Sequence, residues 1–168
     1  MILRKLNHLT KTEFTEFLAT IFEHSPWVAS KAAEFRPFAS IEELHKSMCE
    51  VVRNSQEQEI IDLIRAHPNL GDKLEMSTES THEQQGAGLQ NLSREEYAMF
   101  QALNKKYMDT FGFPFVLAVR GKTKNDIREA MEKRVNNSQT IEYETALTEV
   151  FKIARFRLEE KIQVEENV

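Results

Sequence analysis

The sequence predicts an all-α protein, a single domain of seven or eight helices that spans residues 1–168. Helix-start signals, in which a serine or threonine is followed three residues later by a glutamate or glutamine, recur along the chain. Apolar residues then recur every three or four positions, which is the period of a helix with one buried face. The length suits one domain and allows roughly 70% of the unfolded surface to be buried.

The predicted helices follow from these signals in chain order. The start signal occurs at Thr10/Glu13, Ser40/Glu43, Ser55/Gln58, Ser80/Glu83 and Ser93/Glu96. Ser25 with Pro26 is a further start, because a proline at the first helical position loses no hydrogen bond. Apolar stripes follow, namely Phe14, Phe17, Leu18 and Ile21; Ile60, Ile61 and Ile64; and Tyr97, Phe100, Leu103 and Tyr107. Gly112 is expected to end the last of these, and further helices are predicted near 125–135 and 141–162.

Residues 113–119 do not fit the helical pattern. Their sequence, Phe-Pro-Phe-Val-Leu-Ala-Val, is short and apolar and contains a proline. It fits a buried extended segment or the apolar start of another helix, and the periodicity does not decide between them.

Composition narrows the class of protein. The formal charge is −5, with 22 basic against 27 acidic residues, and no concentrated basic stretch predicts a nucleic-acid partner. The single cysteine, Cys49, excludes an internal disulfide and a thiolate zinc cluster, which favours a reducing compartment. No apolar run reaches the roughly 20 residues of a membrane helix, and the N-terminus lacks the apolar core of a signal peptide. We therefore expect a cytoplasmic protein without membrane contact.

His67 is the first candidate for chemistry. Pro68 disfavours helical geometry at the preceding residue, so the helix carrying Ile60–Ala66 should end at His67. An imidazole held at a helix end beside a tight turn is suited to acid–base work. The alternative is a histidine that only caps the helix. His8 and His45 are expected to be solvated, and His24 to be a partner of a helix C-terminus.

Residues 80–89 are the second candidate, because polar side chains there precede two glycines that allow close approach of a ligand. In one interpretation Glu83 only completes the helix start at Ser80. In the other, a carboxylate, a hydroxyl and helix-start amides bind a small polar ligand.

The last predicted helix supplies a cation. At about 100° per residue, Arg155 and Arg157 lie on opposite flanks of its apolar stripe. Glu159 is a ready surface partner for Arg155. Arg157 is expected to be shielded from water and to face inward, where it would bind a carboxylate strongly, or else to cover apolar surface with its stem.

Metal-binding and nucleophile motifs are absent from the sequence. No His-x-x-x-His pair and no pair of cysteines is present at the spacing of a metal site. Cys49 is predicted to lie within a helix and to pack rather than react. The remaining pattern is His, Glu and Arg around a small polar pocket, with no metal and no cofactor.

Four motifs together carry a family resemblance. They are His67-Pro-Asn-Leu-Gly71, Ser80-x-x-Glu-Gln-x-x-Ala-Gly-Leu89, Phe111-Gly-Phe-Pro-Phe-Val116 and Lys152-Ile-Ala-Arg-Phe-Arg-Leu158. In this order and spacing they closely resemble the signature of the 2-oxo-4-hydroxy-4-carboxy-5-ureidoimidazoline (OHCU) decarboxylase family, over roughly residues 6–160.

The resemblance implies an all-α, generally dimeric, cofactor-free enzyme that decarboxylates OHCU to (S)-allantoin, the last step of urate breakdown. It assigns catalytic roles to His67, Glu83 and Arg157. The substrate-binding residues that it implies are Pro68, Ser80, Thr81, His82, Glu83, Gln84, Phe115, Val116, Leu117, Ala118 and Val119. Some bacterial members resemble the N-terminal half of a fusion with urate oxidase, so this chain is expected to be fused to that enzyme or to work beside it.

Two other classes stay open at this point. An acidic all-α domain with apolar stripes could be a protein-interaction module without catalysis, which would leave an apolar groove open. Another cofactor-free lyase or isomerase of a small carboxylated heterocycle could use the same three side chains. The chain ends in Glu165-Glu-Asn-Val168 rather than a peroxisomal address, which again favours the cytoplasm.

Overall fold

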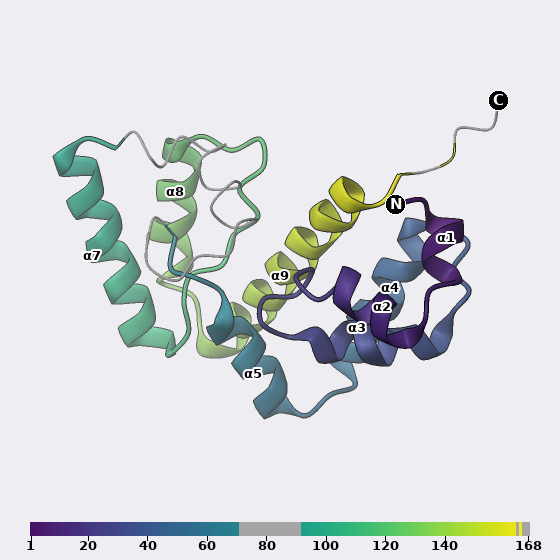
Figure 1. Cartoon of the computed structure of the whole chain (residues 1–168). Coiled ribbons are helices and arrows are strands. Elements are labelled where there is room, and N and C mark those ends of the chain that lie inside the picture. The colour runs from purple at the N-terminus through teal and green to yellow at the C-terminus, as the bar shows by residue number, and fades with distance from the viewer. Residues whose placement is uncertain (71–91, 164, 166–168) are drawn as a thin grey trace. The chain divides into compact units, whose positions relative to one another are not determined.

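The protein is all-α, as predicted (Figure 1). The computed structural model describes residues 1–70, 92–163 and 165. These residues form eight α-helices and one short 3₁₀ helix, with no strand beyond an isolated bridge between Ile2 and Gln163. By its contacts the chain divides into two compact units, residues 1–63 with 151–168, and residues 64–150.

The first unit is built from the N-terminal helices and the end of the last one. Its elements are α1 (Leu3–Asn7), α2 (Lys11–Phe17), α3 (Pro26–Ala32), the 3₁₀ helix η1 (Ala33–Phe35) and α4 (Ile41–Arg53). Helix α3 packs against both α2 and α4. The core of this unit includes Phe14, Val28, Leu44 and Met48, none of which has exposed surface.

The second unit contains α7 (Arg94–Phe111) and α8 (Lys124–Arg134), which pack against each other. Helix α7 ends at Gly112, whose φ of 77° is the left-handed conformation that glycine adopts at little cost. Helices α5 (Glu57–Ala66) and α9 (Gln139–Lys161) contribute residues to both units. The predicted ranges 125–135 and 141–162 therefore match α8 and α9 to within two residues.

The helix starts agree with the sequence in part. Thr10 and Ser93 form complete capping boxes with Glu13 and Glu96. Ser40 accepts from the Glu43 amide, whereas the Glu43 carboxylate binds the Ala39 amide. The prediction at Ser55 is wrong, because its hydroxyl donates to the Val52 carbonyl at the end of α4.

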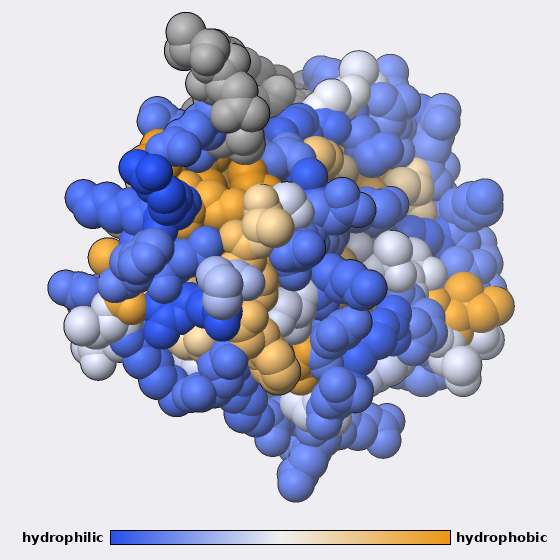
Figure 2. Space-filling view, turned by 90° about the vertical axis from the view of Figure 1, so that its right-hand side faces the viewer, coloured by the Kyte–Doolittle hydropathy of each residue, from blue (hydrophilic) through white to orange (hydrophobic). Residues whose placement is uncertain are grey.

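Because the apolar faces of the helices pack inward, the surface of the protein is mostly hydrophilic. On the face drawn in Figure 2, hydrophilic residues predominate, and hydrophobic ones lie in a narrow band and in small groups. Among the described residues, the exposed large hydrophobic side chains are Phe35, Tyr97 and Ile141. No helix in that part of the chain is long and apolar enough to span a membrane.

Candidate functional site

His67 lies where the sequence predicts. Helix α5 ends at Ala66, and His67 follows it directly, with its amide donating to the Ile64 carbonyl at 3.2 Å. The side chain is only 6% exposed. A buried histidine immediately after a helix and before Pro68 is held in one place, which acid–base chemistry requires.

Two hydrogen bonds fix the turn that carries His67. The Asn104 side-chain amide, on α7, donates to the Leu70 carbonyl at 2.6 Å. Arg65, two residues before His67, donates from Nε to the Gly112 carbonyl at 3.0 Å. The turn is therefore tied both to α7 and to Gly112, the residue immediately before the 113–119 segment.

The sequence analysis missed Asn104, although a signal was present. The buried stripe of α7 is Phe100, Tyr107 and Phe111, while Tyr97 is 45% exposed. Asn104 stands four residues after Phe100 and three before Tyr107, on the stripe itself. A polar residue in an apolar register needs a buried partner, and here that partner is the Leu70 carbonyl.

Residues 113–119 form a buried segment that is neither helix nor strand, which excludes the helical one of the two alternatives that periodicity left open. None of them is helical. The five predicted substrate-binding residues in it are between 1% and 8% exposed, namely Phe115, Val116, Leu117, Ala118 and Val119. The Phe115 ring packs edge-on against Tyr107, with centroids 5.3 Å apart.

A buried polar cluster supports this segment, and the sequence analysis did not anticipate it. Arg134, at the end of α8, donates from Nη1 to the Val116 carbonyl at 2.6 Å and from Nε to Glu142 Oε1 at 2.8 Å. Tyr107 donates its hydroxyl to the same carboxylate oxygen at 2.5 Å. Burial, and then the bond to Glu142, raise the pKa of Tyr107, so the phenol stays protonated.

Arg157 is buried, in agreement with its predicted flank of α9. Its side chain is 1% exposed, and Nη2 donates to Glu23 Oε1 at 2.9 Å. Nη1 donates to the Thr20 carbonyl at 3.1 Å. The predicted strong carboxylate partner thus exists within the chain, as Glu23, which sequence reasoning did not identify.

The residues predicted from the sequence belong to both units. His67, Pro68 and the 115–119 segment belong to residues 64–150, and Arg157 belongs to the other unit. The remaining candidates, Ser80, Thr81, His82, Glu83 and Gln84, lie outside the described residues. Among the described residues, no group of three His, Cys, Asp or Glu side chains is placed to hold a metal ion.

Two other histidines differ from expectation. His45 is half-buried rather than solvated, since Nε2 lies 2.7 Å from the Phe151 carbonyl oxygen, and burial lowers its pKa. His24 lies beyond α2 in a turn, with a φ of 46°, and not at an α-helix C-terminus. Cys49 lies within α4, where burial raises the pKa of its thiol to about 12, so it is poorly suited to react.

This all-α chain, with its buried histidine turn and buried arginine–glutamate pairs, is similar to proteins of a known family. The model of the OHCU decarboxylase family matches residues 7–159. A decarboxylase of that name from Haloferax volcanii is 43% identical over 165 residues, covering 98% of each chain.

A longer relative and a solved structure agree with this match. The uric acid degradation bifunctional protein PucL of Bacillus subtilis is 46% identical over 153 residues, which are 91% of this chain and 31% of that protein. The crystal structure of an (S)-allantoin synthase superposes with a TM-score of 0.80 at 31% identity, over 96% of this chain and 54% of that one. This chain belongs to the OHCU decarboxylase family.

Proposed function

We propose that this chain is a carboxy-lyase that converts OHCU to (S)-allantoin and CO₂. The observation that carries this conclusion is the end-to-end match to a named OHCU decarboxylase, 43% identical over 98% of both chains. In the reaction the bond to the carboxylate breaks and its electron pair moves into the ring. One proton is then delivered to one face of the ring, which sets the configuration of the product.

The roles of the side chains follow from this electron flow. Arg157 would hold an anionic or carbonyl oxygen of the substrate, and its ion pair with Glu23 keeps it oriented before the substrate arrives. His67 would manage the proton, for which a fixed imidazole is suited. Glu83 would orient the ureido N–H groups or disfavour the carboxylate by like charge. The buried 115–119 segment, with Pro68, would hold the ring, and Ser80 to Gln84 would complete the polar side.

Several broader features belong to the same proposal. Because the family model covers residues 7–159, the two compact units would act as one catalytic domain, without a metal or an organic cofactor. We expect a cytoplasmic homodimer that works on the small-molecule substrate OHCU. The match to part of the Bacillus subtilis bifunctional protein supports a setting in which this chain is fused to urate oxidase or works beside it.

The interaction-module alternative is not favoured. Such a module would leave an apolar groove open, whereas seven of the eleven residues in the predicted apolar stripes are buried and, of these eleven, only Tyr97 is exposed. The exposed exceptions, Phe35, Tyr97 and Ile141, lie on separate elements.

The test is a coupled assay. OHCU is generated freshly from urate with urate oxidase and the hydrolase that follows it, this protein is added, and circular dichroism records (S)-allantoin. Rapid formation of one enantiomer, unchanged by a chelator, is the expected result. Formation only at the slow, racemic background rate would refute the proposal.

The role of His67 is tested in the same assay. His67→Asn keeps a polar side chain but removes the titratable group, so kcat should fall at least about 100-fold, as for loss of a general acid or base. A binding measurement with allantoin, the product, checks that the site itself is preserved. Turnover near the wild-type level with product binding intact would exclude His67 from proton transfer.

A further inference from the structure

We propose that Arg134 is a positioning residue that holds the backbone of residues 115–119 in the shape that binds the substrate. Glu142 and Tyr107 fix Arg134 in turn. This inference rests on the proposed function, because it names the support for the segment that holds the substrate ring.

The geometry of Arg134 carries the first step. Arg134 is 7% exposed, and its guanidinium uses two edges at once, with Nε on Glu142 and Nη1 on the Val116 carbonyl, 2.8 and 2.6 Å away. The charged group also lies 4.3 Å from the centre of the Phe115 ring. Because a guanidinium is planar and rigid, fixing one edge fixes the other, and with it the Val116 carbonyl.

The second step is that Glu142 gives Arg134 little freedom to move. Glu142 has no exposed surface. Its Oε1 accepts from Tyr107 and Arg134, and its Oε2 accepts from the Asn137 side-chain amide at 3.0 Å. A buried charge is stable only when it is paired and hydrogen-bonded. Any displacement of Arg134 would weaken the pairing of the Glu142 carboxylate and so raise the free energy of the folded state.

The third step is that residues 115–119 need such support. They are in neither a helix nor a strand, so no repeating ladder of hydrogen bonds holds them. Among the described residues, the backbone–backbone bond that this segment forms outside regular structure is from the Lys122 amide to the Val119 carbonyl. Buried backbone groups require partners. Arg134 supplies one at Val116, where its Nη1 donates to the carbonyl.

The competing explanation is that this cluster only joins the end of α8 to the start of α9. In that case its loss lowers stability and the fraction of folded enzyme, which lowers the apparent kcat in proportion and leaves KM unchanged. A loosened ring-binding segment instead raises KM. The Michaelis constant for OHCU therefore separates the two explanations.

Arg134→Lys is the selective variant. A lysine keeps the charge beside Glu142, but its single ammonium cannot also reproduce the second edge that holds Val116. We expect KM to rise about tenfold in the coupled assay, in line with the cost of misplacing a binding group. Asn137→Ala is the matched control, because it removes a bond to the same carboxylate without touching Arg134 or Val116, and its KM should stay at the wild-type value.

The outcomes are distinct. A KM that is unchanged in Arg134→Lys overturns the proposal, whatever happens to thermal stability, and so does an equal rise in Asn137→Ala. If Arg134→Lys does not fold, Tyr107→Phe replaces it, because the Tyr107 hydroxyl shares Glu142 Oε1 with Arg134 and accepts from Arg134 Nη2 at 3.4 Å, whereas Asn137 binds only Oε2. A KM rise of about threefold is expected, and no rise overturns the proposal. Absence of turnover in the wild-type protein would instead refute the proposed function.

Discussion

Helix α9 carries two arginine–glutamate pairs whose environments are opposite. Arg155 donates to Glu159 at 2.8 Å, and these side chains are 36% and 41% exposed. Arg157 donates to Glu23 at 2.9 Å, and these are 1% and 2% exposed. The distances are nearly equal, so the difference in what the pairs do must come from burial and from which parts of the chain each pair joins.

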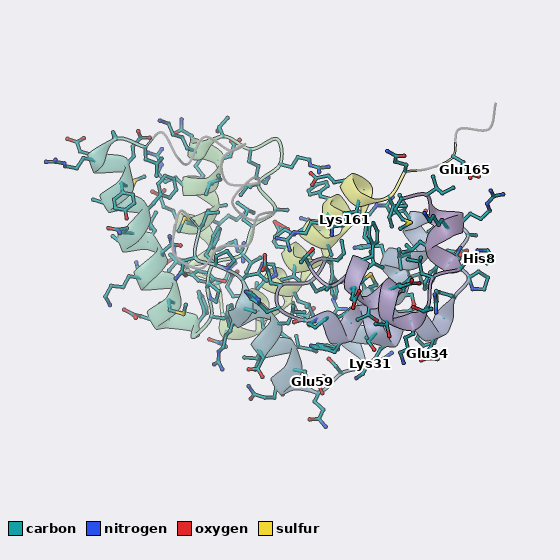
Figure 3. The ribbon with its side chains drawn as sticks, in the orientation of Figure 1. His8, Lys31, Glu34, Glu59, Lys161 and Glu165 are labelled. Carbon is teal, nitrogen blue, oxygen red and sulfur yellow. The ribbon has the colours of Figure 1, made fainter. Side chains whose placement is uncertain are left out.

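The buried pair joins distant segments, whereas the exposed pair stays within one helical turn. Glu23 follows α2, and the same guanidinium also binds the Thr20 carbonyl. Lys161, at the end of α9, likewise donates to the Phe17 carbonyl at 3.1 Å (Figure 3). Removing one partner of the buried pair therefore leaves a charge where water cannot solvate it, and it also breaks a contact between distant segments. In the exposed pair, water solvates the remaining charge.

The largest effect is expected at Glu23. Glu23→Gln keeps the size of the side chain and removes the negative charge that lies beside the buried Arg157 guanidinium. We expect the free energy of unfolding to fall by about 3 kcal/mol, measured by urea denaturation at neutral pH. A loss below about 1 kcal/mol would mean that burial does not increase the contribution of this pair to the free energy of unfolding.

A double variant separates charge burial from packing. Replacing both members, as Glu23→Leu with Arg157→Met, removes the uncompensated charge and retains apolar volume. Such exchanges of buried pairs are often neutral or stabilising, so most of the stability lost in Glu23→Gln should return. Turnover of OHCU should not return, because Arg157 is the proposed partner of the substrate. Recovery of both stability and turnover in the double variant would show that Arg157 does not bind the substrate.

A small effect is expected at the exposed pair. Glu159→Gln removes the charge partner of Arg155, and the free energy of unfolding should change by less than about 0.5 kcal/mol. The value of KM for OHCU should stay at the wild-type level. Because the pair lies on the same helix and has the same chemistry, it is the matched control for Glu23→Gln, and an equal loss in both would contradict the comparison.

The sequence could predict which face of α9 buries an arginine, but not its partner. Helical geometry places Arg157 inward within a short window. The Glu23 carboxylate is 134 residues away, and no local period relates the two positions. Arg134 and Glu142 are only eight residues apart, yet the break between α8 and α9 lies between them, so a single helical wheel cannot pair them either.

Local signals had a similar limit at the helix starts. Ser93 and Glu96 form the expected box, whereas Ser55 has the same spacing but caps the end of α4. The box of Thr123 with Asp126 was missed because its third residue is an aspartate. Spacing identifies which bonds are available, and the packing around the residues determines which of them form.

The smallest effect on stability is expected at a pair that is exposed but joins residues far apart in the sequence. It therefore distinguishes the effect of burial from the effect of joining distant segments. Lys11 donates to Glu34 at 2.5 Å across 23 residues, so this pair joins two elements as Arg157 and Glu23 do. It is nevertheless exposed, and Glu34 is labelled at the rim of its unit in Figure 3. The hydrogen bond from Lys11, and then the lysine charge, hold the pKa of Glu34 below its ordinary value of 4.5.

The sign of the pH dependence follows from that lowered pKa. A carboxyl whose pKa is lower in the folded state than in the unfolded state stabilises the fold above its ordinary pKa, and the contribution is lost as the pH falls through the lowered value. The urea midpoints of wild type and Glu34→Gln should therefore differ slightly and constantly from pH 7 to about 5, and converge on further acidification. Added salt should reduce the difference at neutral pH. A loss of stability in Glu34→Gln as large as that in Glu23→Gln would show that an ion pair stabilises the fold by joining distant segments, and not because it is buried.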